Sequence, residues 1–272
     1  MTSDLSGRRV AMTGNPHPGL EPSTLGRYLL QIRELKGLSR EKACAQIPLS
    51  AAYLGQIESG VRVPRPEALK LLAIGYELSS AQFKHLRELR EPSVDLVGHE
   101  QMRARLRATP GVLERLDDLA RAHMLAGYFD PLWHVLVANH WLYEVFPDLD
   151  RAGNLVVWHF LPVAKDILLE WEREAHVMVQ MLKAAVGHHR KSSLSRQLLT
   201  RLGRSDDFYR LWTTSTEISY GRHSTEHLHL RPGVNQLSSI SIETSTVDDV
   251  NTYYRMFLGM RKPASATDFG PR

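Results

Sequence analysis

The stretch SAAYLGQIESG, residues 50–60, decides how the first part of this 272-residue chain folds. Ser50 belongs to the residue types that cap helix N-termini, and Gly60 is the residue type that most often follows a helix end. Between them, Leu54 and Ile57 are three positions apart, which puts them on one face of a helix. The stretch therefore predicts a short helix that packs through these two side chains and presents the others outward.

Helical patterns also precede this stretch. An apolar stripe on residues 25–35 ends at Gly37, and Ser39 is suited to cap a second, short helix over residues 41–45. Pro48 ends that helix, because proline lacks the backbone donor and moves the residue before it out of the helical region. The sequence thus predicts two helices joined by a tight turn.

The pattern continues downstream of Gly60. Residues 61–65 read as a loop, Pro66 suits the first turn of a fourth helix, and a fifth helix is expected over residues 80–90. We therefore predict an all-α, five-helix domain over residues 23–91. The glycine- and proline-rich residues 1–22 are expected to form a flexible arm.

Positive charge concentrates in the same region. Residues 24–70 contain eight Lys and Arg against four Glu, a difference of +4 that equals the net charge of the whole chain. Local positive charge on a small domain is typical of a protein that binds a polyanion. On charge alone, an ordinary solvated helix surface is the alternative.

The order of capped helices, tight turn, basic loop and proline-started helix resembles the Cro/lambda-repressor (XRE) type of helix-turn-helix. The matching positions are Leu29-x-x-Ile32-Arg33-x-x-x-Gly37-Leu38-Ser39, Ser50-x-x-x-Leu54-x-x-Ile57-Glu58-Ser59-Gly60 and Pro64-x-Pro66-x-x-Leu69-x-x-Leu72-Ala73. The resemblance implies that this is a domain for double-stranded DNA, with the helix after Ser50 as its recognition helix. The residues expected to contact DNA are Arg40, Ser50, Ala51, Ala52, Tyr53, Gln56, Arg62 and Arg65.

These side chains suit different parts of the duplex. Gln56 can pair with adenine through two hydrogen bonds, whereas Ala51 and Ala52 can only approach thymine methyl groups. Tyr53 reaches a phosphate or a base, or else packs. Ser50 and the arginines suit phosphate contacts, which position a protein without specifying sequence. The few base-reading groups predict modest specificity and a dimer that reads two half-sites.

Pro48 departs from the family pattern. It stands where this type of helix-turn-helix usually has glycine, whose positive φ makes the turn. Proline cannot adopt that conformation. We therefore expect the turn to be built differently.

A linker and connecting helix are expected over residues 92–111, and after them the sequence pattern is no longer purely helical. Residues 112–260 mix helical patterns with short alternating ones, which indicates an α+β domain on a small antiparallel sheet, followed by a tail over residues 261–272. The longest helix is expected over residues 162–186. Strands are expected over residues 124–129, 133–139, 225–230, 237–244 and 252–258.

Most of this region resembles the ligand-binding domain of MmyB-like transcription regulators. The resemblance rests on Trp133–Asn139, Asn154–Pro162, Trp171-Glu172, Ser205–Trp212 and Arg231-Pro232-x-Val234, and it departs at Ala138 and Arg231, where Trp and His are usual. It implies a PAS-like fold and a small apolar ligand, such as a fatty acid. Expected ligand-binding residues are Trp133, Trp158, His159, Phe160, Trp171, Trp212, Arg231 and Tyr254; the alternative for each aromatic side chain is that it fills the core.

Other function classes have less support. The single Cys44 allows no internal disulfide, no stretch is apolar for long enough to span a membrane, and the N-terminus is not a signal peptide. These features favour a cytoplasmic protein. His223, His227 and His229 could hold zinc, but no carboxylate is suitably placed beside them. We expect no metal, no cofactor and no catalytic residue.

The leading hypothesis is therefore a ligand-responsive, homodimeric transcription regulator. The coupling between its domains is expected to run through the helix over residues 101–107. Two alternatives stay open: a constitutive DNA-binding dimer whose C-terminal domain only dimerises, and a metal-dependent enzyme fused to a DNA-binding domain.

Overall fold

The computed structural model describes residues 12, 17, 20–222, 227–233, 236–249 and 252–263. The chain divides into two compact units, each made from separate segments. One contains Asn15–Leu96 and Val179–Tyr220; the other contains Met1–Gly14, Val97–Met178 and Gly221–Arg272. Most of the predicted flexible arm and C-terminal tail lies outside the described residues, but His17 of the arm bonds to Asp206 at 2.7 Å and residues 261–263 of the tail belong to a strand.

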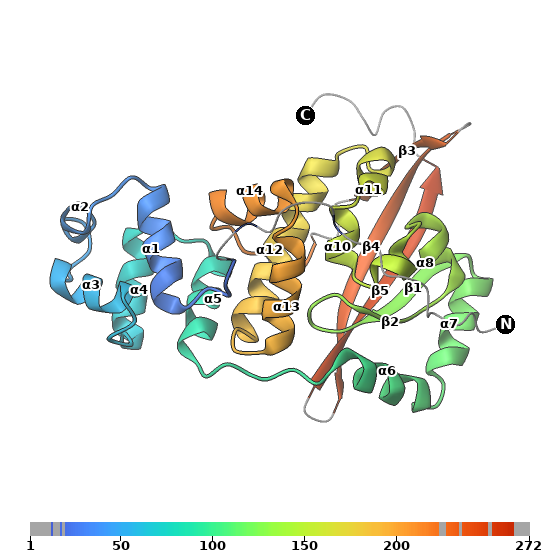
Figure 1. Ribbon diagram of the computed structural model, residues 1–272, viewed down its shortest axis with the longest axis horizontal. Coiled ribbons are helices and arrows are strands. Elements are labelled where there is room, and N and C mark those ends of the chain that lie inside the picture. The colour runs from blue at the N-terminus through green and yellow to red at the C-terminus, as the bar shows by residue number, and fades with distance from the viewer. Residues whose placement is uncertain are drawn as a thin grey trace. The chain divides into compact units, whose positions relative to one another are not determined.

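Five helices form the N-terminal domain, which confirms the predicted all-α part of the fold (Figure 1). Ser39 and Ser50 cap the second and third helices through their hydroxyl oxygens, which accept backbone N–H groups at 3.2 and 3.1 Å. Pro66 occupies the first turn of the fourth helix, as expected. The helices are α1 (Leu25–Leu35), α2 (Arg40–Cys44), α3 (Ala51–Glu58), α4 (Pro66–Gly75) and α5 (Ser80–Arg90).

The turn between α2 and α3 is indeed built without a left-handed residue. The backbone N–H of Leu49 donates to the carbonyl of Ile47 at 2.6 Å, which closes a three-residue turn centred on Pro48. An inverse γ-turn needs φ near −75° at its centre, close to the value that the proline ring imposes. The ring therefore replaces the glycine turn instead of preventing a turn.

The core of this domain includes side chains from much later in the chain. Leu29, Ile32, Leu54 and Ile57 are at most 2% exposed and form its centre. Further members of the same cluster come from residues beyond 178, namely Ala184 and Ile218. The helix-turn-helix region and residues 179–220 therefore share one hydrophobic core.

Three later helices contribute to this unit. They are α12 (Trp171–His188), whose residues from Val179 on belong here, α13 (Ser193–Leu202) and α14 (Asp206–Thr214). The segment after α14 is held to α1 and α5, because the Tyr28 hydroxyl and the Gln82 side-chain amide both donate to the carbonyl of Thr216, at 2.7 and 3.1 Å. The N-terminal domain is thus tied to this segment by hydrogen bonds as well as by apolar contacts.

A five-stranded antiparallel sheet organises the other unit, which confirms the predicted α+β part of the fold. Its order is β2-β1-β5-β4-β3, so the last strand of the chain lies beside the first (Figure 1). β4 and β5 are longer than the sequence predicted. The strands are β1 (Met124–Phe129), β2 (Val135–Ala138), β3 (His227–Gly233), β4 (Gln236–Asp249) and β5 (Thr252–Pro263).

Helices pack on this sheet through two different sets of residues. α6 (His99–Ala108) and α7 (Val112–Arg121) contribute Met102, Leu106 and Leu116 to a cluster with Tyr254 and Met256 of β5. Side chains alternate along a strand, so Phe257 faces the opposite way, where its ring meets Phe146 at 6.2 Å. The remaining short helices are α8 (His140–Val145), α9 (Leu149–Ala152), α10 (Leu155–His159) and α11 (Pro162–Ile167).

Two expectations about secondary structure were wrong. The single helix expected over residues 162–186 is broken between α11 and α12, because Leu168 adopts an extended conformation and bridges to Leu230 in the middle of β3. Trp133 was expected to begin a strand, but it lies in a turn at φ +69°, and β2 begins at Val135. In both places a contact with another segment overrides the local pattern.

Candidate DNA-binding helix and ligand-binding residues

Helix α3 presents one packed face and one open face. Leu54 and Ile57 are buried, whereas Ala52 and Gln56 are exposed, and Ala51 and Tyr53 are half-buried. The exposed side chains follow the sequence expectation for a recognition helix. Small and amide-bearing side chains on an open helix face can approach base edges closely.

Glu58 at the end of α3 fixes the orientation of this helix. Its carboxylate is 1% exposed and accepts Arg33 Nε at 2.6 Å, Arg33 Nη2 at 3.0 Å and Arg40 Nε at 2.8 Å. Arg33 also donates from Nη1 to the Leu38 carbonyl at 2.7 Å, beyond the end of α1. The network joins α1, α2 and α3, so the role of Glu58 in this domain is structural.

Arg40 therefore has a partner within the protein. Its side chain is 45% exposed while its Nε is bonded to Glu58, and it lies 3.6 Å from the position of a Cβ added to Gly55. The arginine therefore lies against α3 beside Gly55. Contact of Arg40 with a DNA phosphate stays a prediction, and it would be made by an arginine already held in place.

Two further arginines lie in the loop after α3. Arg62 and Arg65 are both exposed, and the guanidinium of Arg62 lies 5.5 Å from the ring centroid of Tyr53. The loop is anchored from behind, because Arg90 Nε donates to the Pro64 carbonyl at 3.1 Å. These contacts gather positive charge beside the open face of α3, where a phosphate backbone would run.

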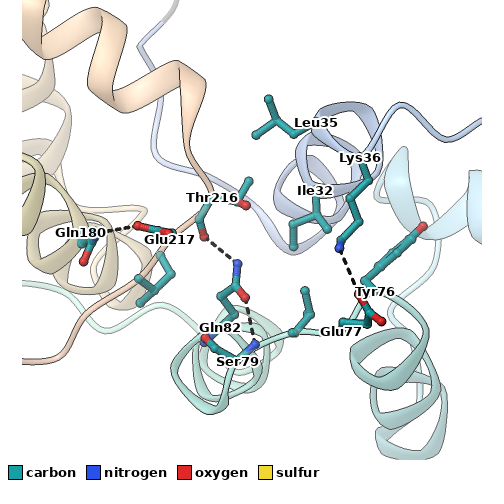
Figure 2. A pocket seen from close by; sticks show the side chains of 12 residues that line it. Ile32, Leu35, Lys36, Tyr76, Glu77, Ser79, Gln82, Gln180, Thr216 and Glu217 are labelled. Carbon is teal, nitrogen blue, oxygen red and sulfur yellow. Dashed lines mark hydrogen bonds and ion pairs between the residues drawn. The ribbon is translucent and has the colours of Figure 1, made fainter.

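A cavity of about 450 Å³ separates the helix-turn-helix from later residues of its own unit (Figure 2). Polar contacts mark its walls: Gln82 donates to the Thr216 carbonyl at 3.1 Å, and Gln180 donates to Glu217 at 2.7 Å. Lys36 and Glu77 form a long ion pair of 4.0 Å at the opposite wall (Figure 2). The two parts therefore meet through a contact that is only partly packed.

Helices α5 and α12 approach each other closely in this unit. His85 is 1% exposed, and a Cβ added to Gly187 would lie 2.3 Å from its Cε1 atom. Burial lowers the pKa of His85 to about 3, aided by the positive charges of Lys183 and Arg190. The imidazole is therefore neutral at physiological pH, and glycine makes room for it.

The expected ligand-binding residues do not all come together. Trp133, Trp158, His159 and Phe160 are buried in the unit that contains the sheet, and the Trp171 indole donates to the His159 carbonyl at 2.6 Å. The other three are placed differently. Trp212 belongs to the other compact unit, Tyr254 packs with α6 and α7, and Arg231 is exposed with its Nε 3.3 Å from the Leu168 carbonyl.

His159 is poorly suited to hold a carboxylate. Its Nδ1 donates to the Leu155 carbonyl at 2.8 Å, and burial lowers its pKa to about 4. It is therefore neutral at physiological pH. The nearby charge is instead carried by Glu174, which is 1% exposed and paired with Arg222 and Arg173. Burial acts to raise the pKa of Glu174, but these two arginines outweigh it, so the pKa is lowered.

The turn before β2 is organised by one buried carboxylate. Asp130 Oδ1 accepts the backbone N–H groups of Leu132 and His134 at 2.9 and 2.8 Å, and Oδ2 accepts His134 Nδ1 at 2.8 Å. Burial acts to raise the pKa of Asp130, but His134 outweighs it, so the pKa is lowered. The ring of His134 in turn stacks on His99 at the start of α6, 5.0 Å away.

Family models match both the helix-turn-helix region and the region that follows it. Residues 24–86 match a helix-turn-helix domain, and residues 108–268 match the MmyB-like transcription regulator ligand binding domain. The chain belongs to the MmyB-like transcription regulators. This MmyB-like regulator matches no curated protein. The family match spans both compact units, because residues 179–220 lie inside it and pack with the helix-turn-helix.

The structure also bears on a metal site and on a membrane-spanning helix in this MmyB-like regulator. Among the described residues, no group of three His, Cys, Asp or Glu side chains could hold a metal ion. The rings of His227 and His229 are 6.4 Å apart, and His223, the third member of the proposed cluster, lies outside the described residues. Within the described part of the chain, no helix is both long and apolar enough to cross a membrane.

Proposed function

We propose that this MmyB-like regulator is a cytoplasmic homodimer that binds operator DNA through α3 and senses a small apolar ligand in its C-terminal domain. One observation carries the DNA-binding part. The exposed Ala52 and Gln56 form an open face on α3, next to the exposed Arg62 and Arg65. The packed face of the same helix is fixed by buried Glu58, so the open face is held at a defined angle.

The shared core supports a response of this DNA-binding face to a ligand. Ala184 and Ile218, which belong to the ligand-binding family match, pack in the core of the helix-turn-helix. Coupling requires an element whose equilibrium both sites can bias. The partly packed contact around the Thr216 hydrogen bonds is such an element, because a small shift of α12 would alter it.

Selection of DNA sites with the purified full chain tests the DNA-binding part. Gln56→Ala should relax preference at one base pair by about 1–3 kcal/mol, because only a base contact carries sequence information. Arg65→Ala should weaken all sequences alike and reduce the salt dependence by about one charge. Gln197→Ala, which changes an exposed glutamine on α13, serves as the control. An unchanged preference in Gln56→Ala would refute the placement of the recognition helix.

DNA affinity with and without bound lipid tests the sensing part. The chain as purified should differ in operator affinity from the same chain after lipid extraction, and a supplied fatty acid should restore the original affinity. Equal affinities would support the alternative of a constitutive DNA-binding dimer. Sedimentation of the protein on a two-half-site operator tests the dimer, whose half-sites should be about 34–36 Å apart or a multiple of this.

A further inference from the structure

Two buried hydrogen-bond donors lie side by side in the sheet-containing unit without an acceptor. Among the described residues, Trp133 Nε1 and Arg255 Nε are both buried, and neither has a hydrogen-bond partner. The guanidinium carbon of Arg255 is 4.9 Å from the centroid of the Trp133 indole. Indole and guanidinium groups can only donate. Neither group can therefore accept a hydrogen bond from the other, and both N–H groups are left without an acceptor.

The half-buried Arg255 also has no carboxylate partner among the described residues. Its described contacts are with two aromatic rings, those of Trp133 at 4.9 Å and Tyr253 at 5.6 Å, and no ion pair joins it to a described carboxylate. The buried carboxylates Glu58 and Glu174, by contrast, are each paired with an arginine. A partly buried positive charge without a counter-ion favours an anionic partner over a neutral one.

Apolar side chains surround the two donors. Phe129 lies 5.9 Å from the Trp133 ring and 6.0 Å from Phe257, which shares the Arg255 face of β5. Phe257 also meets Phe146 at 6.2 Å. A molecule whose acceptor reached the donors would have its remaining atoms among aromatic rings. The surroundings therefore suit a ligand with an anionic head and an apolar body.

The backbone around Trp133 is held in an uncommon conformation. A φ of +69° is rare for a bulky side chain and persists only where the surrounding structure enforces it. Here the Asp130 carboxylate accepts the N–H groups on both sides of Trp133, and the Asn154 side chain donates to the Leu132 carbonyl at 2.8 Å. Strain of this kind clusters at ligand sites, and here it orients the unpaired indole.

We infer that Trp133 and Arg255 form the subsite that binds the carboxylate of this regulator's ligand. The inference deepens the proposed sensing function and rests on it. Arg255 binds the carboxylate oxygens through its guanidinium, and the Trp133 indole N–H donates a further hydrogen bond. The subsite selects acids over alcohols of equal length, because an alcohol oxygen neither compensates the charge nor accepts from both groups equally well.

Calorimetric titration of the lipid-extracted full chain tests this subsite. The probes are dodecanoate and dodecan-1-ol, which share a chain length and differ in the head group. We expect dodecanoate to bind at least tenfold more tightly than the alcohol. Arg255→Met should remove this preference by weakening dodecanoate at least tenfold while leaving the alcohol within about twofold. Trp133→Phe, which keeps a ring but removes the donor, should weaken dodecanoate several-fold.

The matched control is Arg261→Met, which removes an exposed arginine from the same strand. It should leave both affinities unchanged. Arg255→Lys, which keeps the charge, should retain part of the preference for dodecanoate. The inference is overturned if wild type binds both probes equally or binds neither, or if the Met variants at positions 255 and 261 behave alike.

Failure of the subsite and failure of the proposed function give different results. If dodecanoate binds as expected and operator affinity does not respond, the subsite stands and ligand-controlled DNA binding fails. If lipid extraction changes operator affinity but Arg255→Met leaves the preference for the acid intact, sensing stands and the subsite is wrong.

Discussion

Replacing Glu58 with glutamine removes the charge that holds three helices of the DNA-binding domain together. The Glu58 side chain is 1% exposed and accepts three hydrogen bonds from Arg33 and Arg40. Glu58→Gln keeps the shape of the side chain but turns one acceptor into a donor that faces a guanidinium group. Arg33, whose side chain is only 9% exposed, would then hold a buried charge without compensation.

The expected loss of stability is large. Breaking a buried ion pair by removing one partner costs about 3–5 kcal/mol, because the remaining charge stays away from water. A domain is typically stable by about 5–15 kcal/mol, so the variant should lose about a fifth of its stability or more. Guanidinium unfolding of the full chain, followed by far-ultraviolet circular dichroism, measures this loss.

Two comparisons make the result decisive. Glu77→Gln breaks the exposed 4.0 Å contact with Lys36 and should produce no measurable change, since such pairs contribute little. The double variant Arg33→Met with Glu58→Leu removes both buried charges and should be much more stable than Glu58→Gln, because Arg40 is 45% exposed and can turn to water. A double variant as unstable as Glu58→Gln would refute this reasoning, as would a Glu58→Gln loss below about 1 kcal/mol.

Three other predictions follow from single contacts. Burial holds the pKa of His85 at about 3, whereas the pKa of an unfolded histidine is near 6.5, so only the unfolded chain binds this proton as the pH falls from about 6.5 to 3. The free energy of unfolding should therefore fall in this range by up to about 1.4 kcal/mol per pH unit. Chemical unfolding of His85→Leu at several pH values should lack this component. Gly187→Ala should lower the melting temperature because its Cβ would lie 2.3 Å from His85, whereas Gly98→Ala, with nothing within 4 Å, should not. Asn154→Ala removes the cap of α10 and the hydrogen bond to the Leu132 carbonyl, and should lower the free energy of unfolding by about 2 kcal/mol. A decrease below about 0.5 kcal/mol in chemical unfolding would contradict the role of Asn154 in the Trp133 turn.

The helix-turn-helix could be predicted from the sequence because its signals are local. Ser39, Ser50 and Pro66 each act within one helical turn, so spacing along the chain was enough to place α2, α3 and α4. Even the departure at Pro48 was visible, since proline excludes the glycine turn. The γ-turn that replaces it required the structure.

Features that depend on distant residues were not predicted. The break after α11 results from the pairing of Leu168 with Leu230, and nothing near Leu168 in the sequence signals it. Arg255 has no motif of its own, and only the sheet brings it beside Trp133. A weak signal did exist, because Arg255 and Phe257 share one face of a predicted strand. Tyr254, which the sequence had suggested as a ligand-binding residue, lies on the opposite face and packs against α6 and α7.

The contact between Tyr28 and Thr216 has a consequence for synthesis on the ribosome. These residues are 188 positions apart, and the link between Tyr220 and Glu88 spans 132 positions. At about 5–20 residues per second, roughly 10–40 s pass between translation of the first and second partner of the longer contact. During that interval α1 and α5 expose the apolar surface that Ala184 and Ile218 later cover. Until the C-terminal half emerges, the nascent DNA-binding domain therefore carries an exposed apolar surface of the kind that chaperones bind.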